Sequence, residues 1–186
     1  VKISVEKGMI LKDATPSNIQ FSKGRPVFID TLSFEKYDET RPWIAYRQFC
    51  ENFLYPLWLS HYHKMNFQNL LSVYPDGIPV AVTAKLLPAK SLLNPGVWLH
   101  VQLPLKMSKK NTSGKSIPGF NKNKLLNLVT HLQSIISKLD NSSKTTWSHY
   151  YQETVTGNEY VSKKEKIVLG MLGQINGANM LDLGAN

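Results

Sequence analysis

The sequence predicts an α+β fold that is mainly helical and contains a short β-hairpin. Three observations lead to this class: a hairpin pattern within the first 30 residues, apolar residues at helical spacing in several later segments, and a short apolar strand that ends in a glycine turn at the C-terminus. The chain has 186 residues, of which 42% are hydrophobic. This is enough for one ordinary domain with a packed core, or slightly more. We expect residues 1–140 to form one part, and residues 141–186 to form a linker and the start of a second domain.

The first predicted elements are a helix end and the hairpin. Residues 1–7 are expected to finish a helix, with Gly8 as its C-terminal cap. Asn18–Phe21 and Pro26–Ile29 have the apolar character of two short strands. Ser22–Arg25, which contains a glycine, supplies the turn between them.

Three polar residues flank this hairpin, because Asp13 and Asn18 precede its first strand and Asp30 follows its second. A hairpin brings its open ends together, so we expect the three side chains to converge on one small region. Asn18 and Asp30 offer the oxygen ligands that suit Mg²⁺, and Asp13 is a carboxylate that can orient or deprotonate a hydroxyl. The alternative is a polar turn whose aspartates cap backbone N–H groups.

The helices are predicted from apolar residues that recur three and four positions apart. The strongest pattern runs from Thr40 to about His63, with Thr40 as cap and a kink or break at Pro56. Residues 31–39 before it are expected to be a polar connector. Trp98–Leu105 is expected to be a strand or extended segment, with a helical turn as the alternative. Further helices are expected over residues 67–73, 80–87, 124–139 and 163–175.

The histidines and the cysteine are predicted to have structural roles. His61 and His63 are two residues apart, so they face different directions on a helix and do not form a metal site. His100 is expected to be a packing histidine, because no second ligand lies at a metal spacing in the sequence. Cys50 lies in an apolar stripe and is expected to be a small core residue.

The net charge of +9 raises the question of nucleic-acid binding. Many of the lysines, however, crowd residues 106–123, a segment rich in Ser, Asn, Gly and Pro. Apart from Phe120, this segment lacks the interleaved aromatic residues that stack on bases. We therefore expect a flexible basic loop, and we consider a nucleic-acid partner unfavoured.

Composition also bears on the cellular compartment. One cysteine excludes an internal disulfide framework, which suits a reducing cytoplasm. No apolar run approaches the roughly 20 residues of a membrane span, and no signal peptide opens the chain. We therefore expect a cytoplasmic protein without a membrane span.

The last seven residues, Met180–Asn186, read MLDLGAN, a short apolar strand that leads into D-x-G-x-N. Strands that end in a glycine turn bind ligands in α/β folds, because glycine lets the backbone approach a ligand closely. The pattern resembles motif I of class I S-adenosylmethionine-dependent methyltransferases. This resemblance implies a Rossmann-like domain with S-adenosylmethionine as cofactor, bound by Asp182, Gly184 and Asn186.

The first part resembles another family. Its order of D-x-x-x-x-N, a hairpin, and an aspartate after two apolar residues is similar to the catalytic and metal loops of kinase-like phosphotransferases of the aminoglycoside and choline kinase type. The resemblance implies a kinase-like C-lobe in which Asp13 is catalytic and Asn18 and Asp30 hold Mg²⁺. The sequence departs from that pattern, because Leu11-Lys12 replaces His-Gly and Thr31 replaces the glycine after the metal aspartate. The site is then either active or vestigial.

As a whole, the chain is similar to bacterial two-part proteins in which a degenerate kinase-like segment precedes a methyltransferase domain. The chain begins with valine and stops on the order of 100 residues before a doubly wound domain would be complete. We therefore expect a piece of a longer methyltransferase, inactive alone, whose parent acts on a small-molecule or glycan acceptor. The alternatives are a small-molecule phosphotransferase C-lobe and a non-catalytic basic binding module.

Overall fold

The computed structural model describes residues 1–67, 69–108, 121–139 and 158–175. The chain divides into two compact units, Val1–Ser142 and Ser143–Asn186. The described elements are mainly helices with two small two-stranded sheets, which confirms the α+β class. None of the helices in these ranges is long and apolar enough to span a bilayer.

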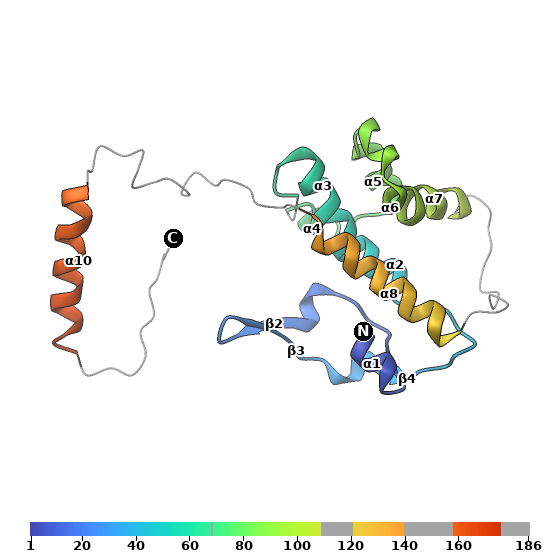
Figure 1. Cartoon of the computed structure of the whole chain (residues 1–186), viewed down its shortest axis with the longest axis horizontal. Helices are drawn as coiled ribbons and strands as arrows, with labels where there is room; N and C mark the ends of the chain where they lie inside the picture. The colour runs from blue at the N-terminus through green and yellow to red at the C-terminus, as the bar shows by residue number, and fades with distance from the viewer. Residues whose placement is uncertain (68, 109–120, 140–157, 176–186) are drawn as a thin grey trace. The chain divides into compact units, whose positions relative to one another are not determined.

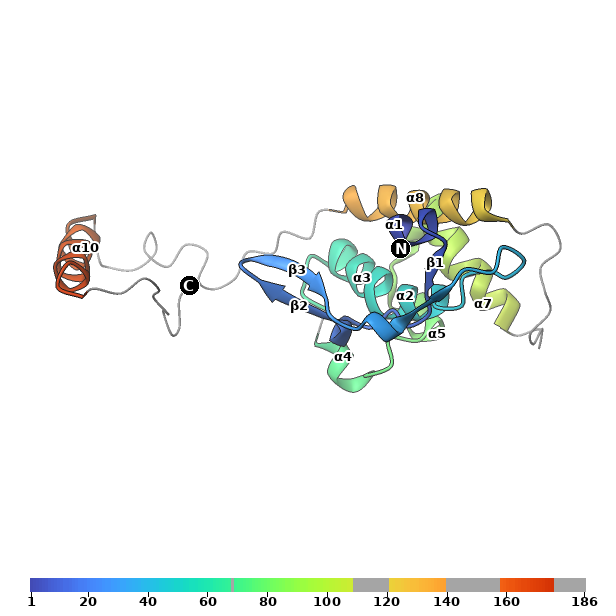
Figure 2. The same ribbon diagram turned by 90° about the horizontal axis from the view of Figure 1, so that it is seen from below.

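The hairpin forms as the sequence predicts. Strand β2 (Ile19–Ser22) pairs antiparallel with β3 (Arg25–Phe28). Lys23 and Gly24 form the two-residue turn, with φ angles of 51° and 73°. Left-handed angles at both positions match the right-handed twist of the strands, and glycine adopts them without a steric cost. The hairpin projects away from the helices of its unit (Figure 1 and Figure 2).

A second sheet joins the N-terminus to a segment expected to be a connector. Helix α1 (Lys2–Glu6) has Lys7 as its C-cap, one residue earlier than predicted, and Gly8 follows with a left-handed φ of +78°. Strand β1 (Met9–Leu11) then pairs antiparallel with β4 (Phe34–Lys36). The connector predicted over residues 31–39 was therefore wrong in part, because it contains a 3₁₀ turn, η2 (Thr31–Ser33), as well as β4. A three-residue strand is too short to show an alternating pattern.

The long helix starts later than predicted. It comprises α2 (Tyr46–Phe49), a π-helical turn, η3 (Cys50–Leu54), and α3 (Tyr55–His63). Thr40 does not cap it, because the backbone N–H and the hydroxyl of Thr40 both bind Asp38 Oδ1, at 2.9 and 2.7 Å. These two bonds place Thr40 in a separate turn before the helix.

The helix does not break at Pro56 but forms a π-helical turn just before it. The N–H of Tyr55 donates to the carbonyl of Cys50, five residues back, so the turn before the proline is widened. The carbonyl of Glu51 is thereby released and accepts a bond from the Ile78 N–H at 2.9 Å. Gly77 makes this approach sterically feasible, since a Cβ on it would lie 2.7 Å from the Cβ of Glu51.

The segment predicted as a strand over residues 98–105 is helical, so that expectation was wrong. It comprises α6 (Pro95–Val97), a second π-helical turn, η5 (Trp98–Gln102), and α7 (Leu103–Ser108). Asn94 caps it by accepting a bond from the Gly96 N–H at 2.8 Å. As at Pro56, the π turn ends two residues before a proline, here Pro104. The cap at Asn94 and the π-helical turn stabilise a helix here, although the apolar side chains alternate as they would in a strand.

The remaining helices lie where the sequence predicts them, but some of them are longer or shorter than predicted. Residues 106–108 end α7 and residues 122–123 begin α8, so these five residues of the predicted basic loop are helical. Residues 109–120 lie outside the described residues. The other elements are η1 (Pro16–Asn18), α4 (Leu70–Val73), α5 (Val80–Leu86), η4 (Ala89–Leu93), α8 (Lys122–Ser137) and, in the second unit, α10 (Asn158–Leu172).

The core of the first unit lies between the helices and β1. Helix α8 buries Leu125 and Leu132 and packs against α1. Burial of such side chains is the main source of stability for the unit. The central side chains are Val5, Leu11, Leu54, Trp58, Leu59, Ile78, Val97, Val101, Leu125 and Leu132.

Candidate functional site

The structure joins Asp13, Asn18 and Asp30 in one chain of hydrogen bonds. The amide nitrogen Nδ2 of Asn18 donates to Asp13 Oδ2 and to the Ser33 hydroxyl, both at 3.1 Å. Ser33 in turn donates to Asp30 Oδ2 at 2.6 Å. The three side chains therefore converge as the hairpin geometry leads one to expect, with Ser33 as the link between Asn18 and Asp30.

Local structure positions each member of this cluster. Asn18 ends the η1 turn, and its carbonyl accepts a bond from the Ile29 N–H at 2.9 Å, which closes the open end of the hairpin. Asp30 Oδ1 accepts a bond from the Leu32 N–H at 2.9 Å and so caps η2. The cap turns the chain so that Ser33 points back toward Asn18.

Gln48 on α2 fixes the position of Asp13. Its Nε2 donates to Asp13 Oδ1 at 2.6 Å, and its Oε1 accepts a bond from the Ala14 N–H, also at 2.6 Å. Sequence reasoning missed Gln48, because a partner 35 residues away leaves no local pattern. The loop is also held by its backbone, since the Trp43 indole donates to the carbonyl of Leu11 at 2.7 Å.

The electrostatics of the cluster favour an ionised Asp30. The hydrogen bond from Ser33 lowers the pKa of Asp30, and the backbone bond from Leu32 adds to this effect. Asn18 makes both of its side-chain bonds through Nδ2, so within the described residues its Oδ1 accepts none. The cluster thus presents one ionised carboxylate and one amide oxygen that is available to a ligand.

These two groups are the types of oxygen that bind Mg²⁺. In the part of the chain that the structure describes, no group of three or more His, Cys, Asp and Glu residues is arranged to hold a metal ion. A cation at Asn18 and Asp30 would therefore complete its shell with water or substrate phosphates. Asp30 Oδ1 also accepts a bond from the Leu32 N–H, so the alternative role of Asp30 as a cap of a backbone N–H explains the position of this one oxygen.

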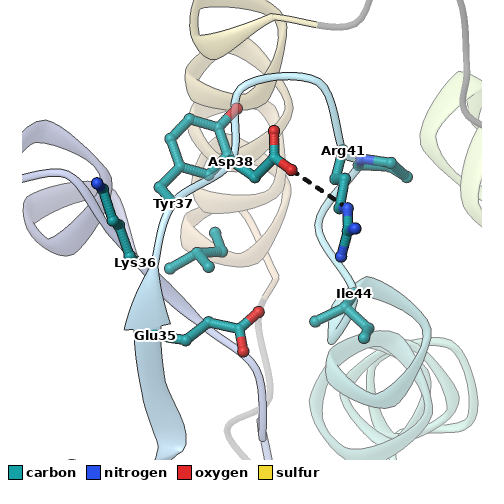
Figure 3. Close-up of a pocket in the computed structure, with 8 residues that line it drawn as sticks. Glu35, Lys36, Tyr37, Asp38, Arg41 and Ile44 are labelled. Carbon is teal, nitrogen blue, oxygen red and sulfur yellow. Dashed lines mark ion pairs between the residues drawn. The ribbon is translucent and has the colours of Figure 1, made fainter.

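A separate pocket of about 370 Å³ lies beside β4 and the loop after it (Figure 3). Across that loop Arg41 forms an ion pair with Asp38, with a distance of 3.2 Å from Nε to Oδ2. Asp13, Asn18 and Asp30 do not line this pocket, so it is distinct from the hydrogen-bonded cluster. Its lining residues are Ile10, Glu35, Lys36, Tyr37, Asp38, Arg41, Pro42 and Ile44.

A second polar network lies among the helices. His100 is completely buried, and its Nδ1 lies 2.5 Å from the Tyr46 hydroxyl. Its Nε2 lies 3.1 Å from Nδ1 of His131 on α8. Burial lowers the pKa of His100 to about 4, and His131 adds to the effect. His100 is therefore a hydrogen-bonded core residue as predicted, and its neighbour His131 lies 31 residues away in the chain, at a separation that forms no recognisable sequence spacing.

The motif residues Asp182, Gly184 and Asn186 lie outside the described residues. Their proposed part in cofactor binding therefore rests on the sequence pattern. The helix that precedes them, α10, is present over Asn158–Leu172, close to the predicted range of 163–175.

Comparison with known proteins gives one informative match. No family model matches the chain, and no solved structure matches it significantly. A protein of Rhizobium meliloti (strain 1021), named Nodulation protein NoeA, is 29% identical to this chain over 191 residues. The match covers 98% of this chain and 40% of that protein, so the chain spans less than half the length of this relative.

Proposed function

We propose that this chain is the N-terminal and linking part of an S-adenosylmethionine-dependent methyltransferase. The observation that carries the proposal is the motif MLDLGAN at residues 180–186, which follows helix α10. Gly184 would let the backbone turn beneath the cofactor, and Asp182 would order that turn and face the positive charge of the cofactor. The cofactor supplies an activated methyl group when bound.

The first unit is proposed to be a kinase-like lobe that is structural or binds the acceptor. The relative supports a longer parent, because the match covers only 40% of its length. Its source in Rhizobium supports a bacterial parent. We propose a small molecule or glycan as the acceptor, because residues 106–123 lack the interleaved aromatic residues of a single-stranded nucleic-acid site.

Calorimetry on the intact parent protein tests the methyltransferase proposal. Gly184→Val and Asp182→Ala should each weaken S-adenosylmethionine binding at least tenfold, since a Cβ at position 184 would obstruct the proposed turn and loss of the Asp182 carboxylate would remove the group proposed to order it. Gly170→Val is the matched control, because a Cβ at this glycine of α10 would meet no atom within 4 Å. If both motif variants bind the cofactor as the wild type does while remaining folded, the assignment is rejected.

A second candidate function is that of a small-molecule phosphotransferase C-lobe. The convergence of Asp13, Asn18 and Asp30 at the open end of the hairpin favours it. In this function Asp13, fixed by Gln48, would orient or deprotonate the acceptor hydroxyl. Asn18 and Asp30 would hold Mg²⁺, which supplies charge neutralisation on the phosphates when bound.

Binding of Mn²⁺, which replaces Mg²⁺ and is visible by electron paramagnetic resonance, tests this second function. Asp30→Asn and Asn18→Leu should abolish binding of one ion per chain. Asp38→Asn is the matched control, because Asp38 also caps a backbone N–H, that of Thr40. Equal Mn²⁺ binding by Asp30→Asn and the wild type would leave capping as the role of Asp30 and remove the phosphotransferase candidate.

A further inference from the structure

Two imidazole nitrogens meet at the boundary between η5 and α8. His100 Nε2 and His131 Nδ1 are 3.1 Å apart, and the ring centroids are separated by 5.2 Å. Two nitrogens that bind the same tetrahedral ion at about 2.0–2.1 Å lie roughly 3.3 Å from each other. The separation of the two nitrogens is therefore within a few tenths of an ångström of that between two ligands of one ion.

We propose that His100 and His131 form a two-histidine site for a borderline divalent cation such as Zn²⁺, Cu²⁺ or Ni²⁺. His100 Nε2 and His131 Nδ1 are the two ligands. His131 is exposed on α8, so the ion enters from solvent on that side. Within the described residues no third His, Cys, Asp or Glu completes the set, so water fills the remaining positions.

The fold holds the buried ligand in a fixed orientation. Pro104 has no N–H, so the carbonyl of His100 lacks its usual helical donor, and the hydroxyl of Tyr55 donates to it instead at 2.7 Å. At the second ring nitrogen, Nδ1, the hydroxyl of Tyr46 lies 2.5 Å away. Ligating histidines commonly have such a partner on the second ring nitrogen, which fixes the tautomer and the ring plane.

Both imidazole rings can bind the ion as neutral groups, so neither ring has to gain or lose a proton. In the complex, His100 carries its proton on Nδ1 and donates it to the Tyr46 oxygen. His131 carries its proton on Nε2, which leaves both facing nitrogens unprotonated. Imidazole nitrogens with water suit Zn²⁺, Cu²⁺ and Ni²⁺, whereas Mg²⁺ prefers oxygen ligands.

The site is distinct from the proposed functions, because it shares no residue with the Asp13 cluster or with the motif at residues 180–186. His131 is exposed, so its replacement leaves the core intact. Tyr46→Phe retains the ring that packs near His100 and removes only the hydroxyl. These two variants therefore probe a ligand and its partner separately.

Competition between the tag-free chain and a coloured chelator for Zn²⁺ provides the test. The wild type should bind one Zn²⁺ at this site, His131→Gln should bind it at least tenfold more weakly, and Tyr46→Phe should lose roughly tenfold. His63→Gln is the matched control, because it removes an exposed histidine from α3. Equal Zn²⁺ affinity in His131→Gln and the wild type, an equal loss in His63→Gln, or no Zn²⁺ binding by the folded wild type would each overturn the proposal.

Discussion

Two polar networks in the first unit differ in burial although both depend on α2. The Asp13–Asn18–Ser33–Asp30 cluster lies on loops and takes Gln48 from α2, whereas the second network takes Tyr46 from the same helix and buries His100 completely. A buried polar group without a partner costs far more than an exposed one, because water cannot replace the lost bond. The first network is therefore suited to exchanging partners with a ligand, and the second is tied to the stability of the fold.

The largest effect should come from His100→Ala. The change removes a fully buried ring, leaves a cavity, and deprives the Tyr46 hydroxyl of its partner. We expect the free energy of unfolding to fall by about 3–5 kcal/mol. Urea denaturation measures this, and a loss no greater than that caused by Asn18→Ala would remove the distinction between the two networks.

The pH dependence of stability should come mainly from the buried network. The pKa of His100 is lowered from 6.5 to about 4, so between these values the unfolded chain binds a proton that the native chain does not. The free energy of unfolding should therefore fall as the pH drops from about 6.5 toward 4, by about 1.4 kcal/mol per pH unit. Above pH 6.5 this residue should contribute no dependence.

A flatter profile in His100→Phe, measured by urea denaturation between pH 4.5 and 7.5, would support this assignment. Asp30 does not interfere, because its pKa is lowered from 3.8 and the stability it contributes is lost only at more acidic pH. The same slope in His100→Phe and the wild type would mean that another group titrates.

A smaller effect is expected for Gln48→Met, which keeps the length of the side chain. It removes the bond to Asp13 and leaves the N–H of the buried Ala14 unpaired, so we expect a loss of about 1–2 kcal/mol. Thermal unfolding monitored by circular dichroism measures this loss. Gln133→Met makes the same substitution at an exposed position of α8 and serves as the control. A similar loss in Gln133→Met would show that the bonds from Gln48 to the loop are not the cause.

The smallest effect on stability is expected for Asp30→Asn. The asparagine keeps one side-chain oxygen, which can still accept the bond from the Leu32 N–H, and its amide nitrogen can donate to the Ser33 hydroxyl in place of the bond that Asp30 accepts. The midpoint of thermal unfolding should therefore change less than it does in Gln48→Met. A larger change would place Asp30 among the residues that stabilise the fold and weaken its interpretation as a ligand.

Local signals in the sequence predicted the hairpin and its polar flanks. Lys23-Gly24 allows a two-residue turn, and Asn18 and Asp30 sit at the ends of the strands it joins. The predicted helices at residues 80–87 and 124–139 also formed near their expected bounds, because Pro88 and the apolar stripe of α8 act within one or two turns.

Features that depend on distant partners could not be predicted. Gln48 reaches Asp13 across 35 residues and His131 reaches His100 across 31, so neither pair leaves a spacing to recognise. The helical form of residues 98–105 was missed because the side chains alternate like a strand. The cap at Asn94 and the bond from Tyr55 to the His100 carbonyl stabilise the π-helical conformation there.

The most direct test of the methyltransferase proposal is a calorimetric titration of S-adenosylmethionine into two proteins, the intact parent and the 186-residue chain. The parent should bind one cofactor per chain. Under this proposal the 186-residue chain should bind little or none, because one strand and its glycine turn form only part of a ligand site that neighbouring strands complete in α/β folds. Tight binding by the 186-residue chain would show that the cofactor site has been misplaced, and absence of binding by the folded parent would contradict the proposal.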